Sequence, residues 1–227
     1  MQSAPTTPSF NLNDIDKNLG ELAVMLVQQQ GIHFATHKEA EKHLDNTTTQ
    51  LRELLQQSST MFIEGLKYLT EKNHQPVSDI TRQLLEHIQN PKEMAAIIEA
   101  NILKNERSLE MFSAAVNSFY GCGDYHVEEC VISVLLTLFP LEPQPFACYG
   151  TLIWRKNGIE DAAAFYKSIV DLFETPILDY FSADCFAKSG DKTEARRLLE
   201  RALKNAQASP EIYEDIMQFI RIALREI

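Results

Sequence analysis

Three glycines in the C-terminal half of the chain recur at nearly equal intervals. Gly123, Gly158 and Gly190 are 35 and 32 residues apart. The chain as a whole is poor in turn formers, with only 8 glycines and 9 prolines among 227 residues. A fold rich in β-turns needs many such residues, so this shortage favours an all-helical chain with short loops. Repeats built from two helices have a period of about 34 residues, which matches the interval between these glycines.

The residues between these glycines fit the same repeat. In a tetratricopeptide repeat, small residues at fixed positions let two antiparallel helices approach closely, and a turn residue separates the two helices. Positions 116, 150 and 183 are equivalent in this scheme and lie 34 and 33 residues apart. We therefore predict a tetratricopeptide-repeat superhelix of antiparallel helix pairs, with three repeats over residues 106–208 and a capping helix over residues 209–227.

The N-terminal region has helical periodicity but no repeat. We expect a disordered tail over residues 1–12 and a helical region over residues 13–105, which begins with a helix over residues 13–30. A second helix is predicted over residues 36–73, where a coiled-coil spacing appears. The positions with this spacing are Ala40, Leu44, Thr47, Leu51, Leu54, Ser58, Met61, Gly65 and Tyr68. Thr47, Ser58 and Gly65 weaken this seam. The pattern therefore favours a helix that packs against its own domain, with a homodimerisation helix as the alternative.

Charge and hydropathy narrow the choice of partners. Asp and Glu (32) outnumber Lys and Arg (21), which gives a net charge of −11. Phosphate binding needs a basic surface, so we expect no nucleic acid partner. No stretch reads as a membrane span, and the first residues lack the features of a secretory signal. We therefore interpret the four cysteines as reduced thiols of a cytoplasmic protein.

One group of residues resembles a set of metal ligands. Cys122, His126 and Cys130 follow one another at intervals of four residues, which places potential ligands on one side of a helix. Gly121 and Gly123, however, interrupt the helix beside Cys122, and the sequence offers no evident fourth ligand. We therefore predict no metal site and no cofactor.

Two pairs of neighbouring carboxylates are the remaining candidates for acid–base chemistry. Glu128-Glu129 and Glu160-Asp161 both fall at predicted helix starts, where acidic side chains interact favourably with the helix dipole. We expect both pairs to be exposed. Since serine and cysteine nucleophiles also lack a recognisable neighbouring base, we predict a protein that is not an enzyme.

The first helices of stacked repeats line a concave groove that binds peptides. Repeat geometry turns the second, fifth, ninth and twelfth positions of each unit toward this groove, Gln144 and Ile177 being second positions. One polar and one aromatic residue of each unit are the candidates for binding. The predicted groove residues are Asn117, Tyr120, Thr151, Trp154, Tyr180 and Asp184. Aromatic side chains in such a groove give a large contact area and are typical hot spots of binding. Trp154 fits a peptide anchor, but it also fits an ordinary core residue.

The second and third predicted repeats resemble a known family. The motif Phe-Ala-Cys-Tyr-Gly at residues 146–150, the segment 162–166, and Ser-Ala-Asp-Cys at residues 182–185 ahead of Gly190 are similar to the class II chaperones of bacterial type III secretion, the LcrH/SycD type. The resemblance covers about residues 106–225. It implies three tetratricopeptide repeats whose groove binds a short extended segment of a translocator. Members of the family have a shorter N-terminal lead-in, often used for dimerisation.

These observations leave two functions from different classes. The resemblance implies a non-enzymatic bacterial cytoplasmic chaperone that keeps a translocator or effector client soluble before secretion, with a possible homodimer through the N-terminal helices. The alternative is a tetratricopeptide scaffold or regulatory adaptor that bridges two protein partners. A helical enzyme with an unrecognised site would instead need a polar pocket with convergent titratable groups.

Overall fold

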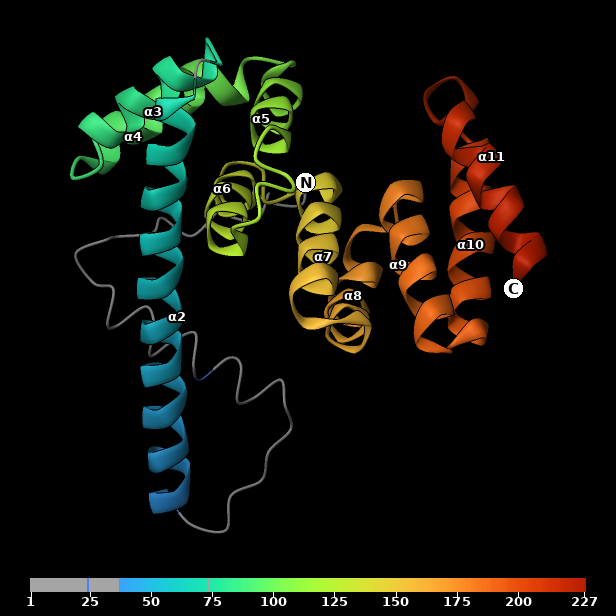
Figure 1. Cartoon of the computed structure of the whole chain (residues 1–227). Helices are drawn as coiled ribbons and strands as arrows, with labels where there is room; N and C mark the ends of the chain where they lie inside the picture. The colour runs from blue at the N-terminus through green and yellow to red at the C-terminus, as the bar shows by residue number, and fades with distance from the viewer. Residues whose placement is uncertain (1–23, 25–36, 73) are drawn as a thin grey trace, which may run out of the picture. The chain divides into compact units, whose positions relative to one another are not determined.

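The computed structural model describes residue 24, residues 37–72 and residues 74–227. In this part of the chain every regular element is a helix (Figure 1), which confirms the all-helical fold class. None of the helices formed by these residues combines the length and the apolar character that crossing a membrane requires. The elements in chain order are α2 (His37–Glu71), α3 (Val77–Glu86), α4 (Pro91–Ile98), the π-helical turn η2 (Glu99–Leu103), α5 (Ser108–Asn117), α6 (Tyr125–Leu138), α7 (Pro143–Asn157), α8 (Ile159–Phe173), α9 (Pro176–Ser189), α10 (Lys192–Gln207) and α11 (Pro210–Glu226).

The chain divides into two compact units, residues 1–60 and residues 61–227, and α2 runs across the division. The predicted tail lies outside the described residues. The same holds for the predicted helix over residues 13–30, apart from residue 24, which is helical. In the first unit, Leu54 and Leu55 of α2 are exposed. The long helix predicted over residues 36–73 is confirmed as α2. The homodimer expected through the N-terminal helices remains a prediction.

The end of α2 that belongs to the second unit packs into a hydrophobic core. Phe62, Leu66 and Leu69 are buried there, whereas Met61 and Tyr68 of the predicted seam are only partly buried. Of the three seam positions in this unit, Gly65 is buried as predicted. The spacing is therefore right, but the centre of the buried face is rotated by about one residue. A rotation of one residue is about 100° on a helix. It turns the largest apolar side chains toward the core, and the heptad pattern alone did not distinguish these residues from their neighbours.

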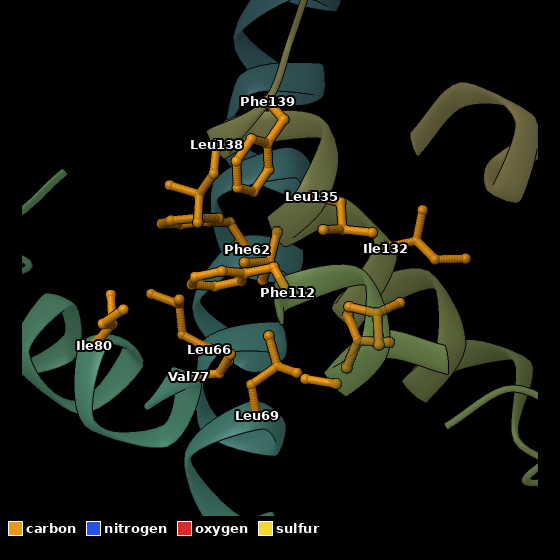
Figure 2. Close-up of a cluster of buried hydrophobic side chains, with 14 of the residues drawn as sticks. Phe62, Leu66, Leu69, Val77, Ile80, Phe112, Ile132, Leu135, Leu138 and Phe139 are labelled. Carbon is orange, nitrogen blue, oxygen red and sulfur yellow. The ribbon is translucent and has the colours of Figure 1, made fainter. Parts of the chain in front are cut away.

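The first core joins the end of α2 to α3, α5 and α6 (Figure 2). Its members come from both sides of the boundary predicted between residues 105 and 106. Phe112 is fully buried at its centre, and its ring meets the Phe139 ring edge-on with centroids 5.8 Å apart. The residues labelled in Figure 2 are Phe62, Leu66, Leu69, Val77, Ile80, Phe112, Ile132, Leu135, Leu138 and Phe139.

The rest of the second unit is a succession of helix pairs, α5–α6, α7–α8 and α9–α10, followed by α11. The first helices begin at Ser108, Pro143 and Pro176, and α11 begins at Pro210, so the pattern recurs every 33 to 35 residues. Each helix from α5 to α11 packs against the next one, and α7 also contacts α9. Among the first helices, α7 contacts α9, and α9 contacts α11. Figure 1 shows α7 and α9 side by side.

The turns of these pairs contain the three periodic glycines. Gly123, Gly158 and Gly190 have φ values of 87°, 109° and 96°. Residues with a Cβ atom rarely adopt this region. Gly190 ends α9 in the left-handed conformation, and Asp191 then caps α10 by accepting a hydrogen bond from the Glu194 backbone amide. The turn positions predicted from the glycine spacing are confirmed.

Small residues make up much of the second core, which is formed by the helices from α7 to α11. Ala162, Ala183, Ala195 and Ala202 are all fully buried. Alanine at a helix contact lets two backbones approach closely, because only a methyl group separates them. The sequence interpretation of these positions as close-packed small residues agrees with their burial.

Candidate functional site

One cavity of the second unit, termed the main cavity, lies on the face formed by the first helices of the pairs. It has a volume of about 430 Å³. Residues of α5, α7 and α9 form its sides, and residues of α6 form its floor. Its walls are mostly apolar, which is typical of a cavity that receives an apolar side chain. The lining residues are Val116, Asn117, Tyr120, Glu128, Val131, Ile132, Gln144, Ala147, Cys148, Thr151, Ile177 and Phe181.

Three of the six predicted groove residues meet at this cavity. Asn117, Tyr120 and Thr151 all line it. Gln144 and Ile177, which occupy the second position of their predicted repeats, line it as well. The Thr151 hydroxyl donates a 2.9 Å hydrogen bond to the Ala147 carbonyl, which leaves its oxygen able to accept one from a ligand.

A second hollow of about 510 Å³ adjoins the main cavity. Ile177 and Phe181 line both spaces, so these two side chains form a shared wall. The far side of the second hollow is the apolar face of α11, where Ile212 and Phe219 are exposed. Together the two spaces form a groove that extends from α5 to α11.

The other three predicted groove residues lie away from the main cavity. Tyr180 lines the second hollow and also a third, smaller hollow, where it is joined by Asp184. Lys188 forms an ion pair with Asp184 at 2.7 Å. The Lys188 Nζ atom also lies 4.3 Å from the centroid of the Trp154 ring. Trp154 lines none of these three spaces and packs, half-buried, against the second core. Its position favours the core interpretation over the anchor.

Glu128 corrects the sequence interpretation of the carboxylate pairs. It was expected to be exposed, but its side chain is only 1% exposed and forms part of the cavity floor. Its carboxylate accepts hydrogen bonds of 2.6 and 3.2 Å from the Arg155 guanidinium and one of 3.0 Å from the Gly121 backbone amide. Glu129 is paired in parallel with Lys156 at 2.8 Å. The partner helix α7 carries both cations, and this long-range pairing is invisible in the local sequence.

The paired arginine also positions an aromatic residue at the cavity. The Arg155 guanidinium lies 4.4 Å from the centroid of the Tyr120 ring and 5.4 Å from that of Tyr125. The hydrogen bonds to Glu128 raise the pKa of Arg155 above its usual value. A permanent cation stacked on a ring stabilises the orientation of that ring. The Tyr120 ring thus lines the cavity while packed against Arg155, whose charge is balanced by Glu128.

The thiols near the groove are in their protonated form at neutral pH. All four cysteines are free. Burial raises the pKa of Cys148, which lines the main cavity, and raises that of Cys185 to about 11. Since the thiolate is the nucleophile, these residues act as small apolar wall and core groups rather than as reactive centres.

A separate polar cluster forms where α2 meets α6. Glu64, His126 and Cys130 come together there, while Cys122 is exposed and lies outside the group. Hydrogen bonds from His126 and Cys130 lower the pKa of Glu64, and burial together with the hydrogen bond to Glu64 raises the pKa of Cys130 to about 12. The sequence analysis missed Glu64, because it lies 62 residues from His126 along the chain.

Phe181 is the groove residue that repeat geometry missed. It is 41% exposed although it is a large aromatic side chain, and it is the largest apolar residue of the shared wall. The repeat scheme selected its neighbour Tyr180, so the signal was present one position away.

Among known proteins, no family model, no curated protein and no solved structure matches the chain.

Proposed function

We propose that this protein is a non-enzymatic chaperone that binds an extended segment of a client protein in the groove. The observation that carries the proposal is the main cavity, whose sides come from the first helix of each of three successive pairs. An apolar cavity that opens along a row of helices fits the side chains of an extended peptide. The resemblance to the translocator chaperones of type III secretion favours such a segment as the ligand.

The regular spacing of the pairs supports the finer assignment of the fold. Helix pairs that recur every 33 to 35 residues and contact their neighbours in order are typical of tetratricopeptide repeats. We infer that α5 to α10 are three such repeats and that α11 caps them. The apolar face that the last repeat would otherwise expose is covered by α11, where Ile220 is fully buried.

The electrostatics of the cavity favour an apolar and uncharged ligand group. Its one lining carboxylate, Glu128, is neutralised by Arg155. The remaining polar lining groups are the amides of Asn117 and Gln144 and the hydroxyls of Thr151 and Tyr120. Amides and hydroxyls can bond the backbone of an extended segment while its apolar side chains enter the cavity. In this proposal two side chains of one segment occupy the two spaces beside the shared wall.

The proposed cellular setting follows from the same family resemblance. A chaperone for secretion acts in the bacterial cytoplasm before its client is exported, where thiols stay reduced. The net charge of −11 suits a client with basic flanks around an apolar segment. Nucleic acid has no place in this proposal.

Peptides tiled across hydrophobic translocator proteins test the proposal. We expect one tile to bind the full chain in a fluorescence anisotropy titration, and Phe181→Asp to weaken it by about tenfold or more, because a charge then faces both spaces. Thr151→Phe, which fills the main cavity, has the same expected effect. Leu172→Asp is the matched control, since Leu172 is a 74% exposed leucine of α8 outside these spaces. Equal affinities for Phe181→Asp and Leu172→Asp would refute the groove.

The alternative function is an adaptor that bridges two proteins. The division of the chain favours this alternative, because a separate unit over residues 1–60 could bind a second partner. Removing residues 1–60 distinguishes the two functions and leaves Phe62 and the first core in place. A chaperone keeps its full client affinity after this deletion, whereas an adaptor loses one of two captured partners. Far-UV circular dichroism checks that the shortened chain is folded.

A further inference from the structure

Three different ligand atoms converge where α2 meets α6, away from the groove. The Glu64 Oε2 atom lies 2.9 Å from His126 Nε2 and 3.5 Å from Cys130 Sγ. The third side of this triangle, from Cys130 Sγ to His126 Nε2, is 3.7 Å. All the ligand atoms of the group therefore lie close enough together to bind one ion.

The triangle has the dimensions of one face of a zinc tetrahedron. Zinc bonds are about 2.0 Å to carboxylate oxygen, about 2.05 Å to histidine nitrogen and about 2.3 Å to sulfur. Tetrahedral angles between such bonds place oxygen and nitrogen about 3.3 Å apart, oxygen and sulfur about 3.5 Å apart, and nitrogen and sulfur about 3.6 Å apart. The observed distances of 2.9, 3.5 and 3.7 Å follow the same order and differ from these values by a few tenths of an ångström.

The backbone of the two helices fixes this arrangement. His126 and Cys130 are four residues apart on α6, so their side chains share one face. On α2, Gly65 lies directly against the Cys130 carbonyl, and a Cβ atom there would overlap that oxygen. The neighbouring Glu64 is therefore held beside both α6 ligands. Leu66, which is fully buried, secures the same turn of α2 in the first core.

The contacts differ from those of a catalytic triad. In a triad, the acid and the nucleophile bond to different nitrogens of the imidazole ring. Glu64 and Cys130 both contact the same atom, Nε2 of His126. Groups that meet at one point surround an ion, whereas groups arranged in a line relay a proton. The geometry thus favours a metal ion over a nucleophile.

We propose that Glu64, His126 and Cys130 bind one Zn²⁺ ion and that water occupies the fourth position. A set of one sulfur, one nitrogen and one oxygen ligand selects a borderline ion such as Zn²⁺ over Mg²⁺ and Ca²⁺. The side chains of His126 and Glu64 are 59% and 36% exposed, so solvent and the ion can reach the site, while the buried Cys130 closes its inner side. The ion replaces the thiol proton and joins the end of α2 to α6.

Cobalt is the probe for this site, because Co²⁺ in a tetrahedral thiolate site absorbs visible light. The full chain is stripped with a chelator and titrated with Co²⁺ alone. We expect one Co²⁺ per chain, a thiolate-to-cobalt charge-transfer band, and displacement of the cobalt by Zn²⁺. A titration without a thiolate band would overturn the proposal.

Single substitutions identify the ligands. His126→Ala and Glu64→Gln change exposed or partly exposed side chains. We expect each to weaken cobalt binding by at least about tenfold, because even the loss of a group that only hydrogen-bonds to a metal ligand can cost that much. Cys122→Ser is the matched control, since this thiol is exposed near the start of the same helix and should leave binding unchanged. Loss of the band in Cys122→Ser, or its full retention in His126→Ala, contradicts the site. Zinc should also raise the melting temperature of the parent chain, and not that of His126→Ala.

Discussion

The two hydrophobic cores of the second unit are built from different kinds of side chain. The first core, around Phe112, is filled by phenylalanine, leucine and valine from α2, α3, α5 and α6. The second core, which is formed by the helices from α7 to α11, contains many alanines, such as Ala183 and Ala195, each fully buried. Large side chains fill the space between helices, whereas small ones allow close contact of backbones. Only the second arrangement imposes a fixed period on the sequence.

Each core nevertheless includes one buried pair of an acid and an arginine. Glu128 of α6 pairs with Arg155 of α7 beside the first core. Asp179 of α9 is fully buried beside the second core and accepts hydrogen bonds of 3.0 and 2.7 Å from Arg201 of α10. Such pairs contribute little net stability but are costly to break. They distinguish one helix contact from another where the apolar surfaces alone are similar.

The largest expected effect tests whether the two cores unfold together. Phe112→Ala should reduce the free energy of unfolding by about 3–5 kcal/mol, because it removes a fully buried ring. Helix α7 contributes Leu152 to the first core and Ala147 to the second. We therefore expect urea unfolding, followed by circular dichroism, to shift as a single transition. Two separate transitions would show that the cores are independent.

The next effect compares the two buried ion pairs. Arg201→Ala should cost about 3 kcal/mol, because it leaves the Asp179 carboxylate buried without its partner. Arg155→Ala should cost less, since Glu128 keeps its hydrogen bond from the Gly121 amide. Burial raises the pKa of Asp179, so the loss in Arg201→Ala should shrink as the pH falls and the carboxyl becomes neutral. An equal loss at neutral pH and at acidic pH values where both proteins remain folded would contradict this account.

Two glycines inside helices limit the contrast in packing, because each core has one position with no room for a Cβ atom. A Cβ atom at Gly65 would overlap the Cys130 carbonyl beside the first core, and one at Gly150 would overlap the Tyr166 ring in the second. Alanine at either position should cost about 1–3 kcal/mol. Gly65→Ala should cost more, because a ring can rotate and a backbone carbonyl cannot. Combining Gly150→Ala with Tyr166→Leu should recover part of the loss, and thermal unfolding of the three variants checks the order.

The smallest expected effect concerns a turn between helices. Gly190→Ala should destabilise the chain by about 1 kcal/mol, since φ is 96° and alanine is strained in this region. Gly190→Asn should cost less, because asparagine tolerates the left-handed conformation better. The melting temperatures of the two variants distinguish this backbone effect from steric crowding, which would penalise the larger asparagine more.

The parts of the fold that were predicted from sequence are those with a local cause. The turn glycines and the buried alanines of α7 to α10 follow from backbone strain and close helix contact, and both leave a periodic trace. The first core leaves none, because Phe62 and Phe112 meet only after the chain has folded. The face of α2 was rotated by one residue for the same reason. Its buried side depends on what α3, α5 and α6 present.

The candidate groove was predictable to a similar extent. Repeat geometry found Asn117, Tyr120 and Thr151, because their direction depends only on their place in a helix pair. It missed Phe181, and it could not foresee that Arg155 neutralises Glu128, since that pair spans two helix pairs. The sequence also pointed to His126 and Cys130 but missed Glu64, the third member of their cluster, for the same reason. A contact across 62 residues has no signature in a local pattern.

The wall shared by the two spaces of the groove acts as a spacer for any segment that lies across it. With Phe181 between them, a large side chain on each side must belong to residues separated by the width of one ring. In the proposed complex, the groove would discriminate between segments by the interval between their bulky residues more than by the identity of those residues. Unrelated sequences with the same spacing would then bind alike, and moving one bulky residue of a segment by a single position would abolish the binding of that segment.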